Sequence, residues 1–155
     1  MALNLGKKMS NKTLNFLSRL IGLLQTFGGL WGIFFIIISK SSYLNYGLIL
    51  GALVFIFCFA SGLLLLFKSK YSIEISILNQ LIQVFSFSAA GILLRYFTPL
   101  NLEVSLIKDS GLVLDFRFAS KLQFSFNDSN DFEFVSINLL ALFFLLVLNA
   151  SRSTN

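Results

Sequence analysis

Four apolar runs constrain this chain more than any other feature of its sequence. They lie at Leu20–Ile38, Tyr43–Phe67, Ile75–Phe97 and Val135–Ala150. A helix needs about 20 apolar residues to cross the hydrocarbon core of a bilayer, and the first three runs approach or exceed that length. The fourth run is shorter, so it would cross with little tilt or would thin the bilayer locally. We predict four transmembrane helices, over 17–38, 43–67, 75–97 and 135–150.

The composition agrees with a membrane protein. Charged residues form 12% of the chain and hydrophobic residues 56%, whereas a soluble domain carries about 25% charged residues. A chain this hydrophobic is not intrinsically disordered. We therefore expect one polytopic membrane domain over 1–155, with the lipid bilayer as its first partner.

The charge distribution indicates an orientation in the membrane rather than a nucleic-acid partner. The net charge is +5, but the basic residues flank the apolar runs and no nucleic-acid motif is present. Cytoplasmic flanks of membrane helices carry an excess of lysine and arginine. One side of the predicted helices has seven basic residues: Lys7, Lys8, Lys12, Arg19, Lys68, Lys70 and Arg152. The other side has five: Lys40, Arg95, Lys108, Arg117 and Lys121.

Both termini are therefore expected in the cytoplasm. The basic segment 1–16 and the tail 151–155 would lie inside, and the loop 98–134 would lie outside the cytoplasm. The first run exceeds a typical signal core and no small-residue cleavage site follows it, so we expect an uncleaved helix. Abundant Phe, Ile, Asn, Lys and Ser suggest AT-rich coding. The expected location is a bacterial inner membrane, with an organelle membrane as the alternative.

The loop between the third and fourth runs changes its hydrophobic period to two. From Leu102 to Phe134 nearly all apolar side chains fall on even numbers and most odd positions are polar. This alternation predicts strands with one apolar and one polar, net-acidic face. Turn residues at 108–111 and 127–131 separate the strands. The predicted fold is thus four transmembrane helices with a small antiparallel β-meander, about 102–134, inserted between helices three and four.

Three strand registers keep the apolar side chains of this meander on one face. Within one antiparallel register the numbers of paired residues have a constant sum. The sum is 218 for the register with Val104–Leu114, 240 for that with Phe116–Phe124 and 258 for that with Phe124–Phe134. An open sheet cannot cross a bilayer, because its edge hydrogen bonds would be unsatisfied in lipid. We expect it on the outer membrane surface with its apolar face covered by its own helices, by lipid or by another protein. The candidate partner face consists of Phe116, Phe118, Phe124 and Phe126.

Three amides form a candidate polar cluster within the membrane. Asn79 and Gln83 share one face of the third predicted helix, and Gln25 lies at a similar depth on the first. A hydrogen bond from Gln25 to Asn79 or Gln83 would hold the helices together. The alternative is a substrate or ion path, although the four runs contain no Asp, Glu or His for proton coupling.

Enzymatic chemistry finds little support in the sequence. The chain has no histidine, its single cysteine is Cys58, and no nucleophile has an adjacent base. The segment 127–131 lacks the spacing of a calcium loop and is typical of a solvated turn. We predict no catalytic residue, no cofactor and no metal site.

The sequence favours a small non-catalytic integral membrane protein, a subunit or assembly partner of a membrane protein complex. The alternative is a small transporter or channel formed by self-association. Its homo-oligomer would form through the glycine pairs Gly28–Gly32 and Gly47–Gly51. A membrane enzyme acting on lipid fits the sequence least.

Overall fold

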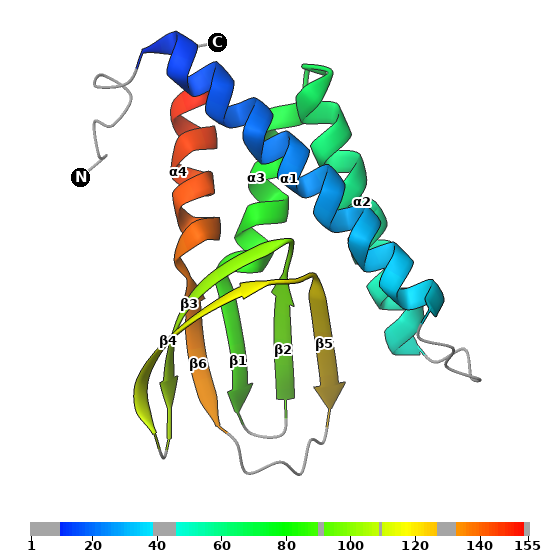
Figure 1. Cartoon of the computed structure of the whole chain (residues 1–155), viewed down its shortest axis with the longest axis vertical. Coiled ribbons are helices and arrows are strands. Elements are labelled where there is room, and N and C mark those ends of the chain that lie inside the picture. The colour runs from blue at the N-terminus through cyan, green and yellow to red at the C-terminus, as the bar shows by residue number, and fades with distance from the viewer. Residues whose placement is uncertain (1–9, 39–45, 90–91, 109, 127–132, 154–155) are drawn as a thin grey trace.

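The chain folds into a helical bundle joined to a curled antiparallel sheet (Figure 1). The computed structural model describes residues 10–38, 46–89, 92–108, 110–126 and 133–153. The helices are α1 (Asn11–Ile38), α2 (Tyr46–Leu66), α3 (Ser72–Val84) and α4 (Leu139–Arg152). The strands are β1 (Phe85–Ala89), β2 (Ile92–Phe97), β3 (Leu100–Ile107), β4 (Gly111–Phe118), β5 (Lys121–Phe126) and β6 (Phe134–Asn138). Helix α1 begins and α4 ends at the end of the bundle farthest from the sheet.

Two helices among the described residues are long and apolar enough to cross a membrane. They are α1 and residues Leu48–Leu66 of α2. The prediction of four transmembrane helices is therefore wrong. Helix α3 has 13 residues and α4 has 14. At about 1.5 Å per residue each is about 20 Å long, against about 30 Å for the hydrocarbon core.

The third apolar run fails as a continuous helix because its period changes near the middle. Helix α3 passes directly into strand β1 without a loop. There Ser86 and Ser88 alternate with Phe85 and Phe87, which gives a strand one polar and one apolar face. Hydropathy averaged over the whole run does not detect this alternation. The fourth run likewise contains strand β6 before α4 begins.

The six strands form one antiparallel sheet in the order β4-β3-β6-β1-β2-β5. The predicted register of β3 with β4 is confirmed, since Val104 pairs with Leu114. The other two registers, and the meander with them, are wrong. Strands β4 and β5 lie at opposite edges, β5 pairs with β2, and β6 lies between β3 and β1. Strands β1 and β2 come from the run predicted as the third helix, so the prediction lacked the correct partners.

Helices α1 and α2 approach closely through glycine. A Cβ atom added to Gly29 would lie 2.5 Å from the backbone nitrogen of Phe59, closer than real Cβ atoms come. A Cβ atom on Gly32 would overlap the ring of Phe55 in the same way. Small residues allow such close backbone packing between apolar helices. Gly32, half of the predicted Gly28–Gly32 pair, therefore packs within the chain.

Replacing Gly29 by valine is expected to destabilise the helical bundle. The added side chain would collide with the backbone of α2, and overpacking of this kind costs about 1–3 kcal/mol. Gly51→Ala is the matched control, because its methyl would lie 3.3 Å from the flexible end of Ile36. Thermal unfolding in detergent measures both variants. A Gly29→Val protein with the wild-type midpoint would contradict the close approach.

Candidate functional site

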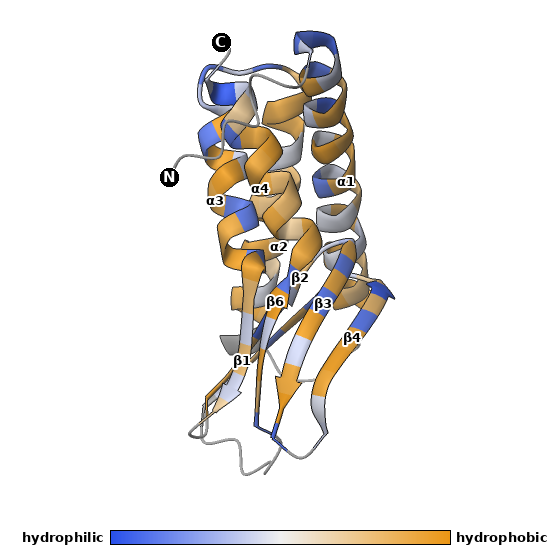
Figure 2. Cartoon of the chain, turned by 90° about the vertical axis from the view of Figure 1, so that its left-hand side faces the viewer, coloured by the Kyte–Doolittle hydropathy of each residue, from blue (hydrophilic) through white to orange (hydrophobic). Residues whose placement is uncertain are grey.

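The sheet is inverted relative to a soluble protein, because its polar face is buried and much of its apolar face is exposed. Along β3 the polar Asn101, Glu103 and Ser105 are buried, while the apolar Leu106 is 63% exposed. Bands of hydrophobic and hydrophilic colour alternate along β3 and β4 (Figure 2). The predicted alternation is thus present. Of the three covers predicted for the apolar face, the first does not apply to β4, because the helices of the chain leave its apolar side chains exposed.

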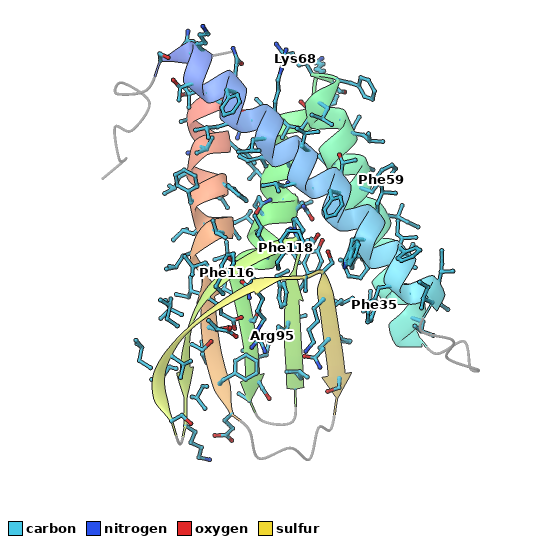
Figure 3. All side chains as sticks on the ribbon, in the orientation of Figure 1. Phe35, Phe59, Lys68, Arg95, Phe116 and Phe118 are labelled. Atoms are coloured by element: carbon cyan, nitrogen blue, oxygen red, sulfur yellow. The ribbon has the colours of Figure 1, made fainter. Side chains whose placement is uncertain are left out.

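The outer sheet face is defined here as the exposed apolar side chains of β3, β4 and β6. Two predicted partner residues belong to it, since Phe116 and Phe118 are each 64% exposed (Figure 3). The remaining members are Leu106, Leu112, Leu114, Val135 and Ile137. An exposed apolar patch on one side of a sheet is a candidate interaction surface.

The other two predicted partner residues lie away from this patch. Phe124 is 40% exposed and belongs to β5, at the opposite edge of the sheet from β4. The backbone of Phe126 pairs with Ile92 in β2, and its side chain is outside the described residues. The structure therefore does not bring the four phenylalanines together on one patch.

The inner sheet face encloses an ion pair between neighbouring segments of the chain. Arg95 on β2 donates to the Glu103 carboxylate on β3 at 2.7 Å, and Asn101 donates to the same oxygen at 2.7 Å. Ser105 donates to the other carboxylate oxygen at 3.2 Å. The Arg95 guanidinium also lies 5.2 Å from the centre of the Phe134 ring. Arg95 lies within the curl of the sheet (Figure 3).

The pKa of Glu103 depends on these neighbouring groups. Burial raises the pKa of its carboxyl, but the hydrogen bonds from Arg95, Ser136 and Asn101 and the charge of Arg95 outweigh burial. The pKa of Glu103 therefore lies below its ordinary value of 4.5. The carboxylate is charged and paired at neutral pH, as a buried charge requires. The sequence placed Arg95 near the outer end of the third predicted helix, with Glu103 or Glu133 as its alternative partners. The structure places Arg95 on a strand and pairs it with Glu103.

The inner sheet face contains a cavity that is small compared with ligand sites. The cavity measures about 90 Å³ and is lined by residues that include Arg95, Asp115 and Arg117, whereas cofactor and drug-sized sites measure about 300–1,000 Å³. Among the residues that the structure describes, no group of three or more His, Cys, Asp and Glu could hold a metal ion. The segment 127–131, considered above as a calcium loop, lies outside the described residues.

Gln25, Asn79 and Gln83 are all buried. The side-chain amide oxygen of Gln25 accepts hydrogen bonds from the Ser61 hydroxyl at 3.3 Å and from the Ser76 hydroxyl at 3.1 Å. These bonds join α1, α2 and α3. Gln25 is thus bonded directly to the third helix, but through Ser76 and not through Asn79 or Gln83, the two partners predicted.

The other two amides connect α3 to the sheet. Asn79 accepts a hydrogen bond from the Tyr96 hydroxyl at 3.2 Å, and Gln83 accepts one from the Thr98 backbone N–H at 3.0 Å. Ser120, directly before β5, donates to the Gly28 carbonyl of α1 at 2.8 Å. These three hydrogen bonds fix the sheet against the helical bundle. Each of them joins a side chain to a different element of the fold.

The comparisons with known proteins give no relative for this chain. Neither the protein-family models nor the curated proteins nor the solved structures contain a match.

Glu103→Gln is expected to destabilise the fold, because it leaves Arg95 without its charged partner. Breaking a buried ion pair costs about 3–5 kcal/mol. The wild-type contribution is present above the unfolded pKa of the carboxyl and is lost as the pH falls through the lower folded pKa. Unfolding in detergent from neutral to acidic pH measures both effects. Glu74→Gln, at an exposed carboxylate, is the control. A Glu103→Gln protein that keeps wild-type stability and its acid dependence would refute this role.

Proposed function

We propose that this protein is a non-catalytic integral membrane protein, a subunit or assembly partner of a membrane protein complex. The outer sheet face is the surface that contacts the partner. The observation that carries the proposal is the inversion of the sheet, which leaves apolar side chains of β3, β4 and β6 exposed. Monomeric proteins rarely expose an apolar patch of this extent unless it binds something.

The outer sheet face continues onto a candidate membrane helix, which supports a partner inside the membrane. The Phe118 ring of β4 lies 6.3 Å from the ring of Phe27 on α1. Phe27 in turn stacks on Trp31 at 5.9 Å, and Trp31 is 46% exposed. A partner that covers both surfaces must itself be apolar along its contact. A membrane protein has such a surface.

The edge of the sheet supports the same proposal. Among the described strands, β4 pairs with β3 and leaves its other edge open. An open edge presents unpaired backbone groups, which are costly in or beside lipid. Strand addition by a partner would satisfy these groups and would seat apolar side chains on the outer sheet face.

The orientation proposed for the protein has both termini in the cytoplasm of a bacterial cell. Lys12, Arg19, Lys68, Lys70 and Arg152 all lie on the ends of α1, α2, α3 and α4 that point away from the sheet. An excess of basic residues marks the cytoplasmic side of membrane helices. The sheet then lies toward the opposite side of the membrane.

Self-association into a transporter gains less support from the structure. Gly32 packs against Phe55 of the same chain, and a Cβ atom on Gly28 would meet the backbone of Pro99. A Cβ atom on Gly51 would lie 3.3 Å from Ile36. The surroundings of Gly47 are outside the part of the chain that the structure describes. The glycine surfaces that would join two copies are thus largely used within one copy.

The double substitution Phe116→Ser with Phe118→Ser is expected to release the partner. It removes two aromatic rings from the edge strand of the outer sheet face, and such rings dominate binding energy at interfaces. Tagged full-length protein is extracted from its native membranes in mild detergent and weighed by native mass spectrometry. The wild type should give a heteromer of defined stoichiometry, and the variant should give the single chain.

Phe67→Ser is the control, because Phe67 is 80% exposed but follows α2, at the end of the bundle away from the sheet. This control should retain the heteromer. A heteromer that survives the β4 double substitution, or a wild-type chain that carries no partner, would refute the proposed docking surface.

A further inference from the structure

A second surface lies at the opposite end of the molecule from the sheet. The start of α1, the turn between α2 and α3, and the end of α4 surround a cavity of about 490 Å³. That volume lies within the range of about 300–1,000 Å³ for small-molecule sites. We name it the basic end pocket. Its lining residues are Asn15, Ser18, Arg19, Leu65, Lys68, Ser69, Lys70, Ser72, Ile73, Glu74, Ser151 and Arg152.

The charges of this pocket favour an anion. Four lining residues are cationic, namely Arg19, Lys68, Lys70 and Arg152. The single lining carboxylate, Glu74, lies 3.6 Å from Arg152. Four positive charges against one negative charge leave a net charge of +3 around the cavity. With Glu74 paired to Arg152, the other three of these four cations have no carboxylate in the pocket lining to balance their charge.

The pocket also contains hydroxyl groups and an apolar floor. Ser18 and Ser151 are joined by a hydrogen bond of 2.9 Å between α1 and α4. Leu65 is buried in the bundle core beside them, and Ile73 packs against that core. Polar donors around an apolar floor suit an amphiphile, with its anionic group at the rim and its chain toward the core.

The backbone adds to the attraction for an anion. The first residues of α3, Ser72, Ile73 and Glu74, line the pocket, and the preceding Tyr71 provides no side-chain cap. A helix N-terminus carries partial positive charge on such N–H groups. The Ser72 N–H is bonded to the Ser69 carbonyl at 3.0 Å, so the attraction at the start of α3 comes from the N–H groups after Ser72, together with the four cations.

Lys68 occupies a backbone conformation that favours glycine. Its φ is 53°, and the following Ser69 N–H donates to the Leu64 carbonyl at 3.1 Å to close the end of α2. Glycine fits this left-handed position with least strain. Residues held in such conformations gather at functional sites. Glycine at position 68 would stabilise the fold more than lysine does. The lysine instead places a cation at the pocket.

The position of the pocket identifies the chemistry of its ligand. It lies beside the start of α1 and the end of α2, the two helices that are long and apolar enough to cross a membrane. Phospholipid headgroups occupy that level of a bilayer, and basic pockets between membrane helices bind anionic headgroups. We propose that the basic end pocket binds the phosphate of an anionic phospholipid. This inference uses the helices and not the outer sheet face, so it stands independently of the proposed partner.

The test is native mass spectrometry of the delipidated full-length protein in detergent, with two added lipids. Phosphatidylglycerol should bind in preference to phosphatidylcholine, which has the same phosphate but no net charge. Each basic residue removed should weaken phosphatidylglycerol binding about fivefold, the contribution of one cation near an anionic surface. The test variants are Lys68→Gly and Arg19→Gln. Lys68→Gly keeps the turn and relieves its strain, so this variant should fold as well as the wild type.

Lys12→Gln is the matched control, because Lys12 lies on the same end of α1 but does not line the pocket. It should bind phosphatidylglycerol as the wild type does. Equal binding of the two lipids, or equal binding by wild type and both pocket variants, would overturn the proposal. Inorganic phosphate in a third arm separates the two sources of phosphate. Inorganic phosphate that binds the delipidated protein at least as tightly as phosphatidylglycerol does would assign the pocket to a soluble phosphate compound and would refute the lipid.

Discussion

The pairing of β1 with β6 is the constraint on which the rest of the structure depends. Both strands leave the helical bundle without a loop, β1 directly after α3 and β6 directly before α4. Their register sets Phe85 opposite Ile137 and Ser86 opposite Ser136. Because α3 and α4 continue into these strands, the helices fix which side of the central pair faces inward. A one-residue slip would reverse every side chain.

Asn138 shows how the chain changes from strand to helix at this point. Its side-chain oxygen accepts hydrogen bonds from the N–H groups of Leu140 and Ala141, which begin α4. In the same sheet Glu103 of β3 is paired in register with Asn138. The helix cap and the buried ion pair are therefore adjacent. The inward polar face begins at the bundle and continues along the sheet.

Because the polar face of the sheet points inward, its apolar face points outward. The directions of these two faces connect the proposed partner surface with the proposed lipid pocket. The exposed surfaces of α1 and of β4 meet at Phe27 and Phe118. They form one apolar surface, while the cations at the far end of the bundle form a polar one. A molecule with an apolar middle and a basic end matches the layers of a bilayer. In this arrangement the partner protein and the lipid headgroup would be bound at different levels of the membrane.

Some of the candidate site could be predicted from sequence because its determinants are local. The alternation around Leu102–Phe118 predicted the strands, and the tight turn between them predicted the β3–β4 register. The burial of Gln25, Asn79 and Gln83 followed from their surroundings of apolar residues. Their actual partners did not follow, because Ser61, Tyr96 and Thr98 come from distant parts of the chain.

The sequence by itself determined two long apolar helices, a period-two segment and a bundle end rich in cations, since each depends on residues close together in the chain. Only the tertiary structure decided that the third run divides into a helix and strands. It also decided that β6 lies between β3 and β1. The direction of the polar face depended on the same pairing. The physical reason is that hydrogen bonds between distant parts of the chain decide which strands pair. A mainly apolar run indicates burial or contact with lipid but does not specify helix or strand.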